Sequence, residues 1–548
     1  MKRRVFWILA SLSVTVGLQA ANPYLPLWEH IPDGEPYVFE DPDNPGEYRV
    51  YIYGSHDILR TRYCGRDQVV WSASVKDLNH WRYDGVILEQ KVDSNGNLLN
   101  PEGLADVLFA PDVVEVTGPG GKKTYYLFPN NQSGIPHDED RDFGYVHGRQ
   151  SMVCKSDRPD GPFIVCNWNP DKPDETVGIL GFDPAVFVDD DGRVYGYWGI
   201  NRSYAAELDP ATMATVKEGT EIISGLIPSH RDPGKFRFFE ASSMRKIKDK
   251  YVLIYSRVTA NGEFGLGSSN YTLAYAYSDS PLGPYTYGGT IIDGRARDVD
   301  ANGKTIPTAN PGGNTHGSIC EINGQWYVFY HRQTGTNEYS RQAMVAPIEV
   351  KVTEGPGGKV EISEGEYTSE GFELDGLDPM EMHSAGIMCY YTRPATERRR
   401  FISGPYVLAS YPEYDGVSDP YDIRFNHNPV VNNTAGSVVG YKYFNFNKFR
   451  RGWLRRKMLY TTLVPQGVDG HVTIMADHPD PARGGIELGS FDLWADMPQE
   501  MTEIGTRLSK VRSLKGKHAI FYVFESNTKE KSLCELHYLV FTKGRKRL

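Results

Sequence analysis

Short apolar runs alternate with polar turns along the first two thirds of the chain. The stretch "GFDPAVFVDDDGRVYGYWG", residues 181–199, has an acidic residue, an apolar run, an Asp/Gly turn and a strand rich in aromatic residues. This pattern predicts a β-hairpin. Similar patterns recur in four other places: 31–55, 109–130, 238–257 and 314–332. About four strands per unit, five units and no long helical periodicity between 25 and 350 predict a five-bladed β-propeller.

Each repeat opens with a polar or ionisable residue. In a propeller the innermost strand of each blade lines the central channel, so we expect these residues to converge. A single acidic residue at the start of a strand is usually a turn or cap, but burying several carboxylates together is costly and favours a functional site. Such a group predicts either a cation site or acid/base catalysis. The five leading residues are Asp33, Asp112, Asp183, Glu240 and His316.

The repeat stops near residue 350. We expect a linker over 351–379 and a β-sandwich of jelly-roll type over 380–548, because short strands such as "VVGYKYFNF" alternate there with polar turns. The predicted fold class is therefore all-β, with a propeller over 22–350 followed by a sandwich. The aromatic residues of the second part fit either a sugar-stacking platform or a core on one face of the sheet.

Composition and the N-terminus narrow the setting. A net charge of −11 argues against nucleic acid as a partner, and six cysteines in 548 residues do not make a disulfide scaffold. Residues 1–20 have a basic start, a short apolar stretch and a small residue near position 20, which predicts a signal peptide. We expect an exported protein, periplasmic or extracellular, with no membrane insertion after cleavage.

Several motifs together resemble glycoside hydrolase family 43. They are "NPYLP" with "IPDGEP", "APDVV", "GFDPAVFVDDDGRVYGYWG", "FFEASS" and "HGSICEINGQWYVFYH". The resemblance implies a five-bladed propeller that hydrolyses glycosides with inversion and needs no cofactor for the chemistry. The second part resembles the carbohydrate-binding modules often joined to these hydrolases.

The resemblance also implies a role for each leading residue. Asp33 would be the general base, Asp183 the carboxylate that tunes and orients, and Glu240 the general acid. His316 would hold a water molecule or a calcium ion in the channel, and Asp112 would shape the sugar pocket. One departure is that Asp33 stands in Asp-Gly-Glu-Pro where the family usually has Asp-Pro, so Glu35 is a rival base.

Inversion requires a protonated carboxyl on the leaving oxygen and an ionised one that activates water. A third carboxylate nearby would raise the pKa of the acid by like-charge repulsion. His56, in "YGSHD", could reach a bound sugar or be a satisfied loop histidine. Arg332 could bind a sugar hydroxyl or pair with a channel carboxylate.

The function that the resemblance implies is exo-acting release of a terminal pentose, with α-L-arabinofuranose preferred, from plant polysaccharide side chains. β-Xylosidase and exo-galactosidase activity are the enzymatic alternatives. The alternative from a different functional class is a noncatalytic propeller that only binds glycans.

Overall fold

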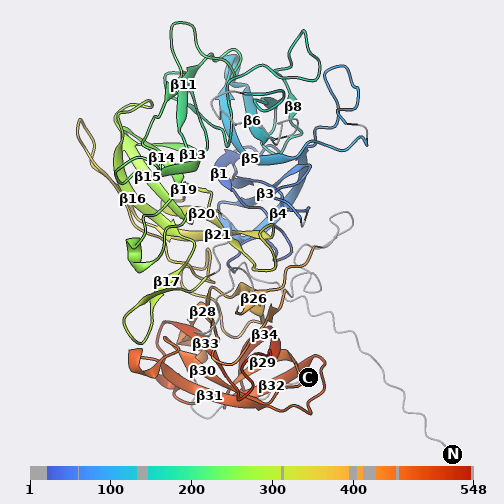
Figure 1. The fold of residues 1–548 in the computed structure, drawn as a ribbon, viewed down its shortest axis with the longest axis vertical. Helices are drawn as coiled ribbons and strands as arrows, with labels where there is room; N and C mark the ends of the chain where they lie inside the picture. The colour runs from blue at the N-terminus through green and yellow to red at the C-terminus, as the bar shows by residue number, and fades with distance from the viewer. Residues whose placement is uncertain are drawn as a thin grey trace, which may run out of the picture.

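The protein consists of a β-propeller and a β-sandwich stacked along its long axis (Figure 1). The computed structural model describes residues 21–59, 61–100, 102–132, 146–309, 314–393, 404–411, 428–451 and 456–544. The predicted signal peptide, residues 1–20, lies outside the described residues. In the described ranges no helix has the length and apolar character needed to span a bilayer. The all-β fold class is confirmed.

The propeller is built from antiparallel sheets whose strands follow one another in sequence. In the described part of the chain, four of these sheets have four strands and the last has three. Two small hairpins, β17–β18 and β22–β23, decorate them. The sheets are β1 (Glu35–Glu40), β2 (Tyr48–Tyr53), β3 (Gln68–Ser74) and β4 (Asp77–Leu88); β5 (Leu108–Thr117), β6 (Lys123–Asn131), β7 (Cys154–Ser156) and β8 (Ile164–Val165); β9 (Ala185–Val188), β10 (Val194–Trp198), β11 (Tyr204–Leu208) and β12 (Ile223–Ser224); β13 (Phe238–Ile247), β14 (Lys250–Arg257), β15 (Thr272–Ser278) and β16 (Thr286–Asp293); and β19 (Ser318–Ile322), β20 (Gln325–Gln333) and β21 (Arg341–Ile348). The hairpins are β17 (Arg297–Val299) with β18 (Thr305–Pro307), and β22 (Val350–Val352) with β23 (Val360–Ile362).

The first strands of the blades surround the axis. β1 contacts both β5 and β19, and β9 contacts both β5 and β13, while β14 contacts β19. The N-terminal segment lies beside β21 in the last blade. The Asn22 side chain donates to the Val345 carbonyl at 2.7 Å and accepts from the Val345 amide at 3.0 Å. Four of the five predicted leading residues therefore lie at or near the starts of strands that meet at the axis, and Asp112 lies in the middle of β5.

The sandwich consists of two packed sheets. One has the strand order β25–β28–β33–β30–β31 and the other β26–β27–β34–β29–β32, with β24 pairing β34. A single helical turn, α1 (Phe446–Phe449), follows β28. The strands are β24 (His383–Ser384), β25 (Tyr390–Thr392), β26 (Tyr406–Val407), β27 (Val430–Val431), β28 (Val438–Asn445), β29 (Lys457–Pro465), β30 (Gly470–Ala476), β31 (Ile486–Leu493), β32 (Thr502–Arg507), β33 (Lys517–Glu525) and β34 (Cys534–Lys543).

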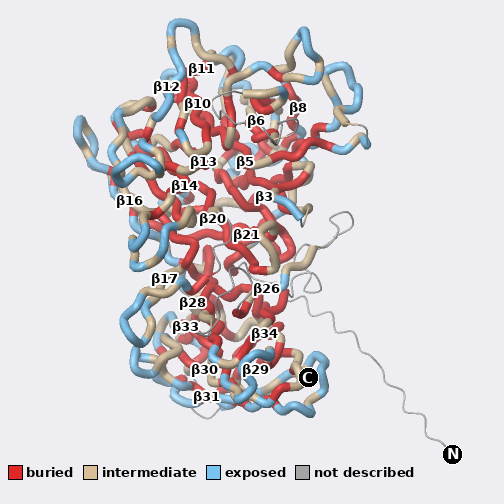
Figure 2. Tube along the Cα trace, viewed as in Figure 1, coloured by how far each residue is buried: buried red, intermediate tan, exposed pale blue. Residues whose placement is uncertain are grey.

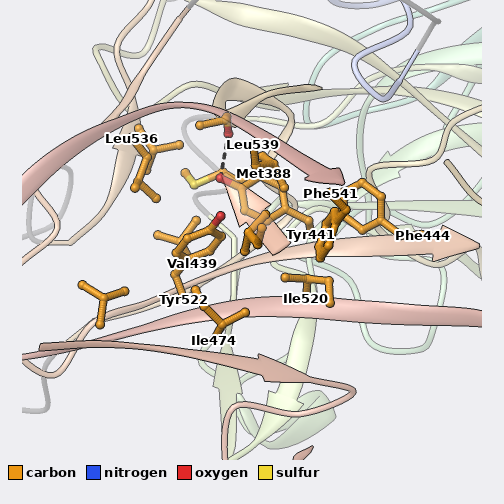
Figure 3. Packing of buried hydrophobic residues seen from close by; sticks show 14 of the residues in the cluster. Met388, Val439, Tyr441, Phe444, Ile474, Ile520, Tyr522, Leu536, Leu539 and Phe541 are labelled. Atoms are coloured by element: carbon orange, nitrogen blue, oxygen red, sulfur yellow. Dashed lines mark hydrogen bonds between the residues drawn. The ribbon is translucent and has the colours of Figure 1, made fainter. Parts of the chain in front are cut away.

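The core of the sandwich includes buried aromatic residues of β28, among them Tyr441 and Phe444 (Figure 3). Tyr441, Phe444 and Phe446 are fully buried and pack against Phe541 and other residues of the facing sheet. Tyr441 and Phe444 lie on either side of an irregularity in the β28–β33 pairing and both face the core, whereas Tyr443 is partly exposed and its hydroxyl donates to Glu366 at 2.7 Å. The buried rings favour the second of the two interpretations that the sequence left open.

The segment expected as a linker packs between the two parts. Tyr367 and Phe372 are buried, and one apolar cluster runs from Tyr330 on β20 to Tyr390 and Phe521 in the sandwich. Buried chain continues without a break through the junction in Figure 2. The propeller and the sandwich therefore share a core instead of being tethered by an independent linker.

Candidate active site

A pocket of about 200 Å³ opens at the propeller axis, where the first strands of the five sheets begin. It brings together four of the five predicted leading residues. Asp33 and Asp183 each precede their strand by two residues, as does His316, and Glu240 is the third residue of β13. The lining residues are Asp33, Tyr63, Cys64, Phe109, Ala110, Phe182, Asp183, Phe239, Glu240, Asn270, Asn314, His316 and Arg341.

Local backbone conformation directs these side chains. Asp33 and Asp183 have φ values of 60° and 46°, in the left-handed region that non-glycine residues seldom occupy. The pairing of β13 with β14 shifts register on both sides of Glu240, and Ala241 has a φ of 66°. Bulges and left-handed residues of this kind re-aim side chains and gather at functional sites.

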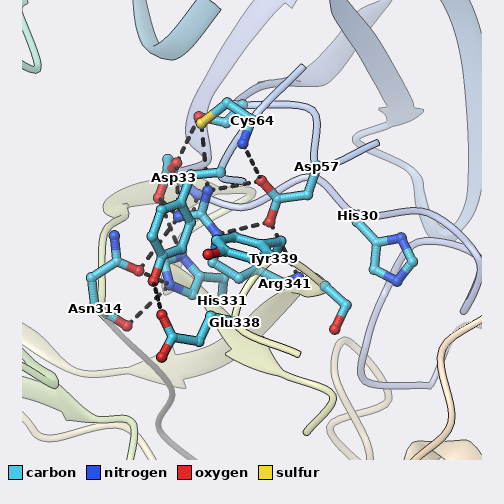
Figure 4. A network of polar contacts seen from close by, with 12 residues as sticks. His30, Asp33, Asp57, Cys64, Asn314, His331, Glu338, Tyr339 and Arg341 are labelled. Carbon is cyan, nitrogen blue, oxygen red and sulfur yellow. Dashed lines mark hydrogen bonds and ion pairs between the residues drawn. The ribbon is translucent and has the colours of Figure 1, made fainter. Parts of the chain in front are cut away.

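Asp33 is held as a carboxylate by a dense set of donors (Figure 4). Arg341 Nη1 lies 2.9 Å and 3.1 Å from its two oxygens, and the Ser55 hydroxyl donates to Oδ2 at 2.6 Å. Burial favours a higher pKa, but the Arg341 charge, the nearby histidines and the Ser55 hydrogen bond together lower the pKa of Asp33 to about 2. The group is therefore ionised throughout the neutral range.

Arg341 is a site residue that the sequence reasoning missed. Its Nε and Nη2 donate to the two oxygens of Asp57 at 2.8 Å and 2.9 Å, while Nη1 faces Asp33. Figure 4 shows the guanidinium between the two carboxylates. The Tyr63 ring lies 4.9 Å from it, and Cys64 donates its backbone N–H to Asp57 at 2.9 Å. Asp57 therefore fixes the orientation of the arginine that orients Asp33.

The surroundings of Asp183 and Glu240 raise their pKa values, in contrast to those of Asp33. Burial and the Asp33 charge raise the pKa of Asp183 to about 8, although Asn130 donates to its Oδ1 at 2.8 Å. Burial, with the charges of Asp183 and Asp33, raises the pKa of Glu240 well above its usual value. One pocket thus holds an ionised carboxylate and a protonated carboxyl, the pair that acid/base chemistry requires.

His316 lies between two of the carboxylates, with Nδ1 3.8 Å from Asp33 and 3.7 Å from Asp183. Burial lowers its pKa to about 4, so the ring is neutral. The surroundings do not fit a calcium ion. Calcium takes six to eight oxygen ligands, and both Asp33 oxygens are engaged by Arg341 and Ser55. In the described ranges no group of three or more His, Cys, Asp and Glu side chains is placed to hold a metal.

Glu35 and Asp112 belong to a second layer, deeper in the channel. Glu35 follows Asp33 by two residues, and Asp112 is the fifth residue of β5. Glu35 Oε2 accepts from Arg245 at 2.8 Å and from Ser243 at 3.0 Å. Asp112 accepts from the Tyr37 hydroxyl and the Val186 amide, both at 2.7 Å. Neither carboxylate lines the pocket, so this geometry supports neither Glu35 as the base nor Asp112 as a sugar contact.

The two other predicted sugar-binding residues also lie outside the pocket lining. His56 is buried between Asp67, 2.6 Å from Nδ1, and Glu29, 3.4 Å from Nε2. Burial opposes protonation, but these acids raise the pKa of His56 to about 10. Arg332 donates to Gln342 and to the carbonyls of Gly386 and Met388. It therefore connects the propeller to the sandwich instead of meeting substrate or a channel carboxylate.

A propeller whose axial pocket pairs an ionised aspartate with a protonated glutamate has the architecture of a glycoside hydrolase. Comparison with known proteins agrees, because the sequence profile of glycosyl hydrolases family 43 matches residues 45–354. The chain belongs to this family and is a glycoside hydrolase.

Three relatives illustrate the similarity. A xylosidase/arabinosidase of Thermoclostridium stercorarium is 33% identical over 78% of this chain and 83% of its own length. A β-xylosidase of Xylanibacter ruminicola is 28% identical over 57% of this chain and 93% of its own. An arabinoxylan arabinofuranohydrolase of Paenibacillus polymyxa is 25% identical over 73% of this chain and 62% of its own.

Proposed function

We propose that the protein is an exo-acting, inverting glycosidase that removes terminal pentose, with α-L-arabinofuranose as the preferred sugar. The feature that carries the mechanism is one pocket that holds both Asp33, whose pKa Arg341 and its other neighbours lower to about 2, and Glu240, whose pKa burial and two aspartates raise well above its usual value. Asp33 would activate water, Glu240 would protonate the leaving oxygen, and Asp183 would keep the pKa of Glu240 high. The name of the Paenibacillus relative supports arabinofuranose, and that of the Thermoclostridium relative includes both xylosidase and arabinosidase.

The exo mode rests on the size of the pocket. At about 200 Å³ it suits one sugar and not a run of several. Monosaccharide should therefore be the first product from arabinan or arabinoxylan, followed by chromatography over time. Early release of di- and trisaccharides would show an endo-acting groove instead.

A β-xylosidase is the second candidate, because the Xylanibacter relative carries that name. Aryl α-L-arabinofuranosides, β-D-xylosides and galactosides separate the candidates directly, since each offers the same leaving group on a different sugar. We expect the arabinofuranoside to have the highest kcat/KM. A higher value for the xyloside would overturn the sugar assignment while leaving the mechanism intact.

Inversion is tested by proton NMR of the first product, before mutarotation. Roles are tested by Glu240→Gln, which should spare aryl glycosides more than glycosides with poor leaving groups, because an activated leaving group needs less protonation. Asp33→Asn should remove activity on both. A retained anomer, or equal losses from both variants on both substrates, contradicts the assignment.

The setting follows from the proposed substrate. A plant polysaccharide cannot enter an intact cell, and the basic and apolar start of residues 1–20 suits export. We therefore place the protein in the periplasm or outside the cell. Fractionation of the producing cells, with N-terminal sequencing of the mature chain, tests this.

A further inference from the structure

A second and larger cavity, of about 950 Å³, lies on the third blade. Two loops form it: one joins β10 to β11, and the other leads from β12 to β13. We call it the blade-three cavity. Its lining residues are Ile200, Asn201, Arg202, Tyr204, Ser224, Gly225, Ile227, Pro228, Ser229, Arg231, Asp232 and Pro233.

Strand direction places this cavity on the same face as the candidate active site. β9 begins two residues after Asp183, at the pocket edge of its sheet. Since β9, β10, β11 and β12 pair antiparallel in that order, the end of β10, the start of β11 and the end of β12 lie at the same edge. Both loops of the cavity therefore emerge on the pocket side of the propeller.

The blade-three cavity also lies next to the proposed acid. The Asn201 amide donates to the carbonyl of Phe239 at 2.6 Å, and Phe239 lines the pocket immediately before Glu240. The His230 ring packs against Phe239 with 5.8 Å between centroids. In an inverting hydrolase the acid protonates the leaving oxygen, so the rest of the substrate must leave the pocket on the side of Glu240.

We propose that the blade-three cavity binds the main chain of a branched glycan while its side-chain sugar occupies the pocket. This inference rests on the proposed function and names the leaving group that the site takes. Space favours it: if the pocket of about 200 Å³ takes one sugar, a cavity of about 950 Å³ accommodates more than one.

The chemistry of the lining suits a hydroxyl-rich chain. Arg202 and Arg231 are exposed, and a guanidinium presents several N–H donors in a fixed fork that can meet paired sugar hydroxyls. Tyr204, also in the lining, is held by stacking on Trp198, with 5.8 Å between ring centroids. It gives the cavity a rigid wall that combines a ring surface with a hydroxyl group.

The test compares hydrolysis of the arabinofuranosyl bond in two substrates, one with a small aryl leaving group and one with a xylan main chain as the leaving group. Ser224→Trp would fill the cavity from the end of β12, and an Arg202→Ala/Arg231→Ala double variant would remove its donors. Arg193→Ala is the matched control, because Arg193 is an exposed arginine of the same blade beside the β9–β10 turn, at the opposite edge. For each protein kcat/KM is measured on an aryl arabinofuranoside and on arabinoxylan oligosaccharides, and xylohexaose binding is measured in a Glu240→Gln background.

We expect both cavity variants to lower the ratio of oligosaccharide to aryl-glycoside kcat/KM by about tenfold or more, mainly through KM, and to weaken xylohexaose binding similarly. Arg193→Ala should leave the ratio and the binding as in the wild type. Unchanged ratio and binding in both cavity variants would overturn the proposal, whatever the aryl-glycoside activity. A wild type that hydrolyses no glycoside, but whose binding of xylohexaose depends on the cavity, would instead refute the proposed function alone.

Discussion

Asp33 and Asp183 are the same residue type in the same pocket, yet their pKa values lie on opposite sides of neutrality. Burial favours the neutral form of both. What separates them is the partner: Asp33 faces the Arg341 guanidinium, whereas Asp183 has a neutral amide from Asn130 and the negative charge of Asp33. The neighbouring side chain thus determines the protonation state of each aspartate, and both neighbours, Arg341 and Asn130, are distant in sequence from the aspartate they contact.

The dependence of kcat/KM on pH should show these assignments. Asp33 must be ionised to act as a base, so activity should persist in acid until the pH approaches about 2 or the fold fails. Glu240 must be protonated, so activity should fall as the pH rises through its elevated pKa. Burial comes first among the causes of that elevation, followed by the charge of Asp183. In Asp183→Asn the alkaline limb should therefore move to lower pH; a limb that stays in place or moves up would count against the coupling.

Arg341→Lys tests the arginine that the sequence did not reveal. A lysine keeps the positive charge but has no fork to meet Asp33 and Asp57 at once. We expect kcat/KM to fall by about 10–100-fold, the range seen when outer-shell partners are lost. The acid limb should rise in pH because Asp33 loses part of the interaction that lowers its pKa. A loss without movement of that limb would mean that Arg341 supports only the fold.

At the scale of the strand, position along the repeat decides what each residue meets. Asp33 lies two residues before β1, in left-handed backbone, whereas Glu35 is the first residue of β1, so the two carboxylates enter different layers. The deeper carboxylate meets Arg245 and Ser243, not the pocket. Asp112 also belongs to the deeper layer, as the fifth residue of β5 and after a register shift between Phe109 and Asp112.

Glu35→Gln separates the two layers. The glutamine can still meet Ser243, and it places no new charge beside Arg245. We expect kcat/KM within about tenfold of the wild type, against a loss of about 10²–10⁴-fold for Asp33→Asn, the usual contribution of a general base. The two variants should be compared on one aryl glycoside, with circular dichroism to confirm folding. A larger loss from Glu35→Gln would return the base to Glu35.

The repeat explains why the fold and part of the site could be predicted from the sequence. Alternating strands and regular turns are signals within short stretches of sequence. The five repeat units and the sandwich could therefore be predicted without knowledge of any tertiary contact. Asp33, Asp183, Glu240 and His316 open equivalent strands, and so their convergence followed from the fold. Arg341 opens the third strand of the last blade, β21, and reaches Asp33 of the neighbouring first blade; no spacing in the sequence signals such a contact.

Arg332 is the converse case: the sequence predicted it as a site residue, and the structure places it outside the pocket. It follows the aromatic run of β20, where a channel contact was a reasonable expectation, but it points toward the sandwich. Only the packing of the second domain decides this. The sequence predicted a linker over 351–379, but the structure shows a packed segment there. The packing could not be predicted from local sequence, because the partners of Tyr367 and Phe372 lie on strands elsewhere in the chain.

At the scale of the whole molecule, the shared core predicts that the two domains unfold together. One apolar cluster joins Tyr330 and Met344 of the propeller to Tyr390 and Phe521 of the sandwich, and separating them would expose this surface to water. We expect a single calorimetric transition for the full chain, with equal van't Hoff and calorimetric enthalpies. Residues 21–379 expressed alone should be insoluble or melt well below the full chain. Two resolved transitions, or a truncated propeller as stable as the whole, would show that the contact is an ordinary domain interface.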